Sequence, residues 1–465
     1  MGQMAFDVLK EPDDTDTESR FEIALSDLAV LGAGPEDIRA GRVRVLLAAN
    51  GERPVDLYSV IREAILRSTM GDGGGDLMAL GQSLLGNTYS TVALDLTGED
   101  LDIRSRRAPD ENFLTAGGMT ARIDLRDVAP RDWGGAEIRV ALQDVEQRDL
   151  APEDSVLSLG EAVFSVRGAE LPVADMLTMA MMLGDPPRGQ PVPARVLVDG
   201  LLNFGALEIR TEGSGVKLEA FDFVFTDGER ELQPLFTGGY DSWSARVGIV
   251  GLNQDAGRIE FAVESSGGSF TPQQAMGPGV EPHVEAWFPT ELQLHTAVSN
   301  LNEAFLKQLL DDVQIADLSE PVELVLPMVL YGSATVLDVA SDRNVYETGL
   351  FRLTQSSDLQ FYPTEIVSMT PYTGQVEVGL RGLDALAAYV DEQARATGAM
   401  RPDEASAVQS VFTVMSNLAE EADDGVLTWS ISRDDIYERE IVVNGVTLRY
   451  PNIAQLMPML MFGQF

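Results

Sequence analysis

Alternation of apolar and polar residues at every second position is the feature of this sequence that most restricts its fold. A period of two puts the apolar side chains on one face of a β-strand, and a chain that repeats it many times has to build a sheet. The segments that show it are residues 21–25, 42–46, 92–96, 121–125, 137–142, 195–198, 216–225, 258–263, 291–297, 375–380 and 440–448. The last of them contains Asn444-Gly445 between apolar runs, which predicts a type I′ hairpin turn.

Several of these strands are expected to end in the same way, with Asp or Gly followed by an aliphatic residue. Asp and Gly suit the backbone of a turn, and the aliphatic side chain can fold back onto the core face. The pairs are Asp27-Leu28, Asp100-Leu101, Asp127-Val128, Asp144-Val145 and Gly382-Leu383.

Five segments have helical periodicity, and four of them are each reached from a strand through a short loop. These four are residues 55–67, 171–183, 301–313 and 383–394, and the fifth, residues 402–422, begins with Pro402 in its first turn. We therefore expect a mainly β, α+β chain in which several short amphipathic helices accompany an antiparallel sheet. Turn-forming residues crowd at 184–193 and 265–282, which predicts two regions, 1–190 and 191–465, with a sub-boundary near 265–283.

The composition excludes some partners and some chemistry. The chain has 465 residues and a formal net charge of −41, which would repel nucleic acids and anionic membranes, so we expect no nucleic-acid partner. It has no cysteine, which excludes disulfides and thiolate chemistry and is typical of exported bacterial proteins. Its start lacks the features of a secretory leader and no apolar stretch could span a bilayer, so a periplasmic protein would have lost its leader or anchor here. A cytoplasmic location is the alternative.

Catalytic and metal-binding motifs are missing from the sequence. The two histidines, His283 and His295, have no second histidine at a ligand spacing, and no serine lies in a nucleophile elbow. Acidic stretches such as 13–18 and 420–425 do not have the spacing of a calcium loop. We expect no cofactor, no metal and no enzymatic activity, although a hydrolase that uses two carboxylates stays open.

Methionine placement is the sequence feature that best suggests a binding site. Methionine is flexible and recurs on surfaces that accept varied apolar partners. We therefore predict that an apolar ligand contacts two groups of methionines, which are Met176, Met179 and Met182 in an almost wholly apolar helix and Met457, Met459 and Met461 near the C-terminus. The alternative is that this helix is simply buried in the core.

Strands that end in Asp-Leu or Gly-Leu, interrupted by short helices such as the one that begins at Gly382-Leu383-Asp384, resemble the AsmA-like proteins of the bacterial envelope. The likeness extends over most of the chain. The resemblance implies a long curved antiparallel sheet that forms an apolar groove, and a role in lipid handling or envelope maintenance.

Three functions are compatible with the sequence. The first is a non-catalytic periplasmic or envelope protein that binds lipid or another apolar ligand. Because the charge opposes contact with anionic lipid surfaces, such a protein would need a membrane-protein partner for docking. The second is an envelope scaffold without a small ligand, and the third is the carboxylate-based hydrolase.

The uncompensated negative charge predicts a salt dependence of stability. Repulsion among the carboxylates opposes compaction at low ionic strength, and added salt screens it. The melting temperature should rise when sodium chloride is increased from low millimolar to molar concentration. A melting temperature that stays constant over this range would mean that the charge does not limit stability.

Overall fold

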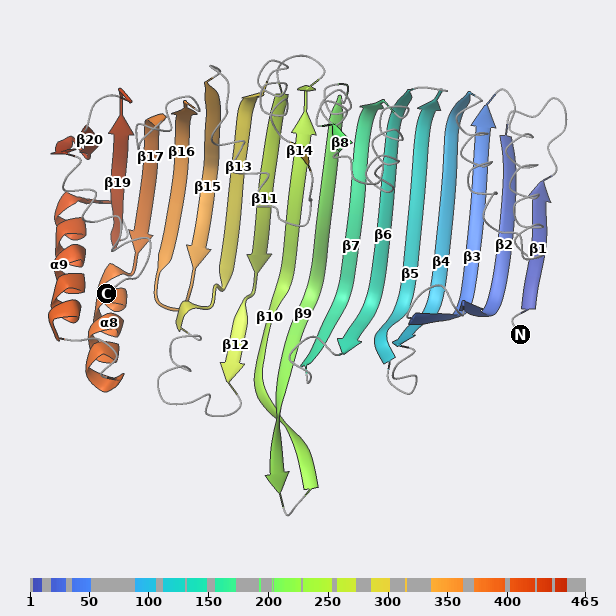
Figure 1. The fold of residues 1–465 in the computed structure, drawn as a ribbon, viewed down its shortest axis with the longest axis horizontal. Coiled ribbons are helices and arrows are strands. Elements are labelled where there is room, and N and C mark those ends of the chain that lie inside the picture. The colour runs from blue at the N-terminus through green and yellow to red at the C-terminus, as the bar shows by residue number, and fades with distance from the viewer. Residues whose placement is uncertain are drawn as a thin grey trace. The chain divides into compact units, whose positions relative to one another are not determined.

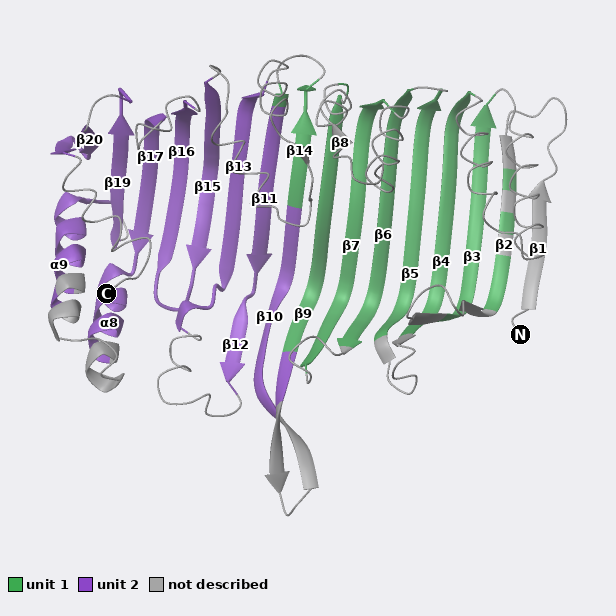
Figure 2. Ribbon diagram, in the orientation of Figure 1, with its two compact units in different colours: residues 1–218, 246–257, 310–318 green, residues 219–245, 258–309, 319–465 purple. Residues whose placement is uncertain are grey.

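A computed structural model shows a mainly β, antiparallel protein, which confirms the predicted fold class (Figure 1). Contacts divide the chain into two compact units, coloured separately in Figure 2. Unit 1 comprises Met1–Leu218, Arg246–Gly257 and Leu310–Leu318, and unit 2 comprises Glu219–Ala245, Arg258–Leu309 and Ser319–Phe465. The structure describes residues 3–10, 18–30, 36–51, 88–105, 112–129, 132–148, 155–172, 192–193, 203, 205–226, 229–252, 257–272, 286–301, 314–315, 336–362, 372–397, 402–422, 425–436 and 440–449.

Unit 1 is built from consecutive strands that each pair with the next one along the chain. They are β1 (Gln3–Lys10), β2 (Glu18–Val30), β3 (Glu36–Gly51), β4 (Tyr89–Ser105), β5 (Asn112–Val128), β6 (Trp133–Arg148) and β7 (Ser155–Leu171), and all six pairings between them are antiparallel. Two short strands of this unit, β8 (Val192–Pro193) and β14 (Gln314–Ile315), pair separately.

The strands of unit 1 are much longer than the alternation alone predicts. Strand β4 has 17 residues where the alternating segment spans 92–96, and β5 has 17 where it spans 121–125. Strand β7 and its neighbour in the sheet, β9 (Ala206–Thr226), are also long, with 17 and 21 residues. An average strand has only about five or six residues, so something must let these strands continue where the alternation breaks.

Left-handed residues occur where the alternation breaks, and each one faces a glycine on the next strand. Asp100 of β4 and Asp144 of β6 have φ angles of 55° and 50°. In the strand register each falls opposite a glycine. Together these residues form a row across strands β3 to β7, which we call the Asp100 line; its members are Gly41, Asp100, Gly117, Asp144 and Gly160.

A second line of the same kind crosses the sheet near the other end of these strands. Asp127 of β5 and Glu170 of β7 have φ angles of 48° and 52°, and Gly134 of β6 lies opposite both of them. The backbone N–H of Gly205 donates to the carbonyl of Glu170 at 3.3 Å and extends this Asp127 line. The two lines mark a central panel of strands β3 to β7 between them.

Glycine is required at 41, 117 and 134 because the left-handed residue of the neighbouring strand fills the space that a Cβ would need. A Cβ on Gly134 would lie 2.8 Å from the Cβ of Asp127, and one on Gly117 would lie 3.3 Å from the Cβ of Asp144. Asp tolerates the left-handed conformation better than most residues. Asp on one strand and Gly on the next therefore let the ladder continue through the irregularity.

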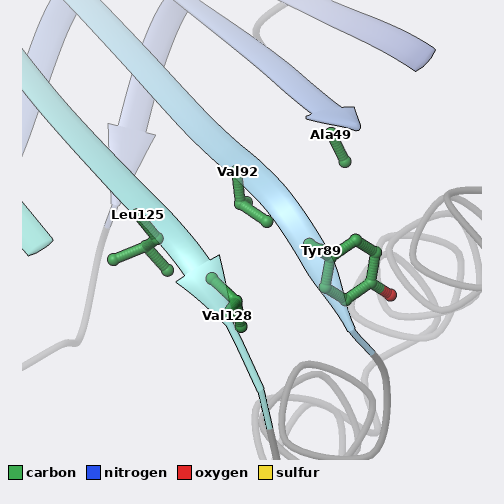
Figure 3. Close-up of a cluster of buried hydrophobic side chains, with 5 residues drawn as sticks. All are labelled: Ala49, Tyr89, Val92, Leu125 and Val128. Carbon is green, nitrogen blue, oxygen red and sulfur yellow. The ribbon is translucent and has the colours of Figure 1, made fainter. Parts of the chain in front are cut away.

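The left-handed residue shifts the alternation by one position. Leu125 and Val128 stand three apart with Asp127 between them, and regular alternation would place them on opposite faces. Instead both belong to one buried cluster with Ala49, Tyr89 and Val92 (Figure 3). The apolar residues thus stay on one face across the Asp127 line.

The predicted pairs of Asp or Gly with an aliphatic residue are therefore right about the burial of the aliphatic side chain. The prediction that each pair ends its strand is wrong. Val128, Val145 and Leu383 are buried, as expected for side chains that fold back onto the core. However, Asp100 and Asp144 lie inside strands β4 and β6 and do not end them. The facing glycines explain the difference, because they allow pairing to resume after each left-handed residue.

Unit 2 contains the remaining antiparallel strands and both helices that the structure describes. Strand β10 (Glu229–Val250), like β9, is divided between the two units. The other elements are β11 (Gly257–Ser266), β12 (Ser269–Pro272), β13 (Glu291–Leu301), β15 (Leu337–Glu347), β16 (Arg352–Phe361), β17 (Tyr372–Arg381), α8 (Leu383–Thr397), α9 (Pro402–Leu418), β18 (Glu420–Glu421), β19 (Val426–Arg433), β20 (Glu440–Val443) and β21 (Val446–Arg449).

The prediction of a helix over 383–394 is confirmed by α8, whereas the predicted helix over 402–422 is too long. Helix α9 ends at Leu418, and Glu420 and Glu421 pair with β19 as the short strand β18. Four carboxylates, at Glu420, Glu421, Asp423 and Asp424, would lie at the negative end of the helix dipole if the helix continued. This repulsion accounts for the earlier end.

Helices α8 and α9 cover one face of β17, β19, β20 and β21. Leu380, Leu383, Trp429 and Val443 are buried there, and Phe412, Met415 and Leu418 of α9 pack against them. Polar bonds fix the helices in place. The indole N–H of Trp429 donates to the carbonyl of Met415 at 3.0 Å, and the amide of Gln409 donates to the carbonyl of Ala387 at 3.1 Å.

The hairpin predicted at Asn444-Gly445 is present between β20 and β21. Asn444 and Gly445 have φ angles of 45° and 77°, as a type I′ turn requires. The side chain of Asn444 also accepts from the N–H of Ser430 at 2.7 Å and donates to the carbonyls of Leu418 and Thr428, each at 2.8 Å. The turn residue thereby joins the end of α9 to strand β19.

The other three predicted helices lie largely outside the described residues. Leu171 and Leu301, the first residues of two of them, are instead the last residues of β7 and β13. The predicted boundary near 190 and the predicted strand over 195–198 also fall outside the described residues. The division into 1–190 and 191–465 stays a prediction.

Substitution of Gly134 by Ala should destabilise the protein by about 1–3 kcal/mol, because the new Cβ would overlap that of Asp127. Gly135→Ala is the matched control, since its Cβ would meet only the carbonyl of Gly168 at 3.5 Å. Urea unfolding measures both. In the Gly134→Ala background, Asp127→Gly should restore stability, because glycine keeps the left-handed backbone and removes the clash. Equal stability of the two alanine variants would contradict the pairing.

Two substitutions of Asn444 distinguish the stability that its side-chain hydrogen bonds contribute from the stability that depends on its left-handed backbone conformation. Asn444→Gly should cost about 3 kcal/mol, because it removes three hydrogen bonds worth about 1 kcal/mol each. Asn444→Ala should cost about 1 kcal/mol more, since alanine disfavours the left-handed region. Thermal unfolding of the three proteins gives both differences, and an alanine variant as stable as the glycine variant would argue against backbone strain.

Candidate apolar ligand-binding face

The central panel of unit 1 has one face that is apolar at every position. Cross-strand register places the side chains in four rows across β3, β4, β5, β6 and β7, and alternation puts all four rows on the same face. We call it the apolar face; its rows are Val43, Gly98, Met119, Leu142 and Ala162; Val45, Leu96, Ala121, Val140 and Phe164; Leu47, Leu94, Ile123, Ile138 and Val166; and Ala49, Val92, Leu125, Ala136 and Gly168.

Burial over the apolar face is uneven. Ala49, Val92 and Leu125, at the end near the Asp127 line, are buried in the cluster of Figure 3. Toward the middle of the face the side chains of Leu47, Leu94, Leu96, Ile123, Ile138, Val140 and Val166 are only partly buried, and Phe164 is 41% exposed. Strand and residue spacings give the face about 20 Å along the strands and about 19 Å across them. A fatty acyl chain of common length could therefore lie along it.

The opposite face of the same panel, the polar face, carries ion pairs within strands and between neighbouring strands. The guanidinium of Arg122 bonds Asp124 at 2.6 Å and approaches Asp95 at 3.7 Å. Arg167 donates to Glu137 of β6 at 2.9 Å. Ion pairs as exposed as these contribute little stability. They keep this face hydrated, so that it is the face of the panel that contacts water.

Charge on the polar face is nearly balanced, in contrast with the net charge of −41 for the chain. The hydrogen bond from Arg44 lowers the pKa of Glu22, and the bond to Asp124 raises the pKa of Arg122. Over β3 to β7 this face carries arginines and carboxylates in nearly equal number, at Arg42, Arg44, Arg122, Arg126, Arg139 and Arg167 and at Asp95, Glu99, Asp124, Glu137 and Glu161.

A hollow of about 620 Å³ lies at the Asp127 line, next to the apolar face. Three of its lining residues carry carboxylates, and no basic residue is among those described. Its lining residues are Asp127, Ala129, Asp132, Trp133, Gly134, Glu170, Pro172 and Asn203. Trp133 also packs against the buried cluster of Ala49, Tyr89, Val92, Leu125 and Val128, so the hollow and the apolar face share a side chain.

The methionines that the sequence analysis assigned to ligand contact cannot be placed on this face. Met176, Met179 and Met182, like Met457, Met459 and Met461, lie outside the described residues. The apolar face was missed because its residues belong to five separate strands, each with ordinary alternation. Only the strand register, which the Asp100 and Asp127 lines help to set, reveals that the apolar residues of these strands lie side by side in rows.

Metal and membrane-spanning features are not found in the described part of the chain. No group of three or more potential metal ligands occurs there, and no helix there is both long and apolar enough to cross a bilayer. His295 lies at the surface with its ring nitrogen 2.6 Å from Glu264.

Comparison with protein-family models, with curated proteins and with solved structures gave no match.

Proposed function

We propose that this protein binds the acyl chain of a lipid on the apolar face of unit 1, as a non-catalytic component of the bacterial envelope. The observation that carries the proposal is the set of four unbroken apolar rows, partly exposed in the middle, with ion pairs on the reverse of the same strands. Apolar side chains that stay partly accessible over several neighbouring strands are typical of a surface with a partner.

Acyl chains fit this face better than a folded protein partner would. Recognition of a protein surface usually combines an apolar centre with hydrogen-bonding groups around it. The four rows contain only apolar side chains and glycines, so they offer van der Waals contact without fixing an orientation. Burial of apolar area supplies the affinity, at about 25 cal/mol per Å².

The resemblance to AsmA-like envelope proteins is consistent with the same role, since it implies lipid handling on an apolar groove. A periplasmic location and a membrane-protein partner belong to this proposal. Arginine and carboxylate on the polar face are almost equal in number, so the excess negative charge lies elsewhere and would oppose direct contact with anionic bilayers.

Replacement of Phe164 by Asp should weaken acyl binding at least tenfold, because it places a charge in the second apolar row. The measurement is titration of the purified protein with a fluorescent fatty acid, together with mass spectrometry of its organic extract. Since Phe164 is 41% exposed, the variant should still fold. A melting curve checks this.

Ser165→Asp is the matched control, because the next residue of the same strand points to the polar face opposite Arg139. It should bind the probe like the unmodified protein. A protein that carries no lipid and does not bind the probe would contradict acyl binding and favour the scaffold function, in which the chain itself covers the apolar face.

A further inference from the structure

A polar pocket of about 460 Å³ lies on the sheet of unit 2, on the face opposite to helices α8 and α9. Leu380 and Leu427 pack with the helices, so the residues that alternate with them on β17 and β19 point the other way. Among these are Glu377, Thr428 and Ser430, which line the pocket. The chain covers one face of these strands with helices and forms a polar pocket on the other.

The floor of this pocket consists mainly of short residues, which lie in two rows across β16, β17 and β19. Glycine is required at 379, because a Cβ there would lie 2.5 Å from the hydroxyl oxygen of Thr354. The floor thus offers hydroxyl groups and an open stretch of backbone. Its rows are Thr354, Gly379 and Thr428, and Ser356, Glu377 and Ser430.

A β-bulge in β15 places charged residues at the rim of the pocket. Asp342 and Arg343 of β15 lie opposite the single residue Ser356 of β16. A bulge redirects side chains and often occurs next to an active site. Both bulged residues line the pocket together with Glu377 and Glu420. Three carboxylates therefore accompany one guanidinium among the lining residues that the structure describes.

Hydrogen bonds within the floor leave it with acceptors. The hydroxyl of Thr354 donates to the carbonyl of Gly379 at 3.4 Å, and that of Thr428 donates to the carbonyl of Glu420 at 3.1 Å. Because a hydroxyl has only one hydrogen, the lone pairs of both threonines remain for a bound molecule. The carboxylates of the rim also only accept. A ligand of this pocket must therefore supply many donors.

From this chemistry we propose that the polar pocket binds a sugar, with preference for one that carries an amino group. Small-molecule sites of about 300–1,000 Å³ are usually lined by apolar side chains, whereas this floor is made of hydroxyls and glycine. A sugar ring matches it, because each ring hydroxyl both donates and accepts. The excess of carboxylates over Arg343 attracts an ammonium group. This site is separate from the acyl-binding function, since all its residues belong to unit 2.

The test is isothermal titration of the purified protein with glucosamine, glucose and glucuronate at fixed low salt. Glucosamine should bind up to about fivefold more tightly than glucose, as one exposed charge pair provides. Glucuronate should bind more weakly than glucose, because its carboxylate meets those of the rim. Ser356→Leu puts a bulky apolar side chain into the floor and should weaken binding of all three at least tenfold. A melting curve shows whether this variant is folded.

Glu377→Gln removes one rim charge and should reduce the preference for glucosamine over glucose. Asp358→Asn is the matched control, because Asp358 lies two residues from Ser356 on the same face of β16 and outside the pocket lining. It should keep the preference. Ethanolamine, which has the ammonium without the ring, should bind far more weakly than glucosamine.

Three results would overturn the sugar site. They are no binding of any sugar by the unmodified protein, unchanged binding by a folded Ser356→Leu variant, and ethanolamine binding as tight as that of glucosamine. The last would reduce the site to charge attraction alone. Fatty-acid binding is measured with a different probe, so acyl binding and the sugar site are decided separately.

Discussion

The sheet of unit 1 depends on the contact between a left-handed residue on one strand and a glycine on the next. A left-handed residue inside a strand shifts the alternation of side chains and disrupts the ladder locally. Opposite Asp127 and Asp144 the neighbouring strands have Gly134 and Gly117, whose missing Cβ atoms leave room for the carboxylate side chains. Pairing resumes beyond each contact, and strands of 16 or 17 residues result.

Separation of an apolar from a polar face follows from the same contact. Without the shift at Asp127, Val128 would point away from Leu125, and the apolar side chains would be divided between the two faces. With it, apolar residues on both sides of the line meet in one cluster, and the arginines and carboxylates collect on the reverse. The backbone conformation of a few residues thus decides which side of the sheet meets water.

Particular residues show how much of this the sequence could predict. Asn444-Gly445 identified its hairpin because type I′ turns depend on local residues alone, and α8 begins at Leu383, directly after Gly382, as expected. Strands β7, β15 and β16 were not predicted. In β15, polar residues such as Ser341 and Asn344 interrupt the alternation, and partners on β16 satisfy them. The apolar face required the register, because the coincidence of Val45, Leu96 and Ala121 in one row is a property of pairing.

Comparison of the two units bears on the proposed binding of an acyl chain to the apolar face. In unit 2 the chain covers its own sheet with α8 and α9, and it fixes them with directional bonds: Trp429 donates to Met415, and Asn444 donates to Leu418. The four rows of the apolar face in unit 1 contain no side chain that could make such a bond. A cover held there by contact area alone would lack a unique position, because specificity in packed interfaces comes from polar groups that must be satisfied. An acyl chain needs no unique position, and the same lack of polar anchors would let it slide or exchange.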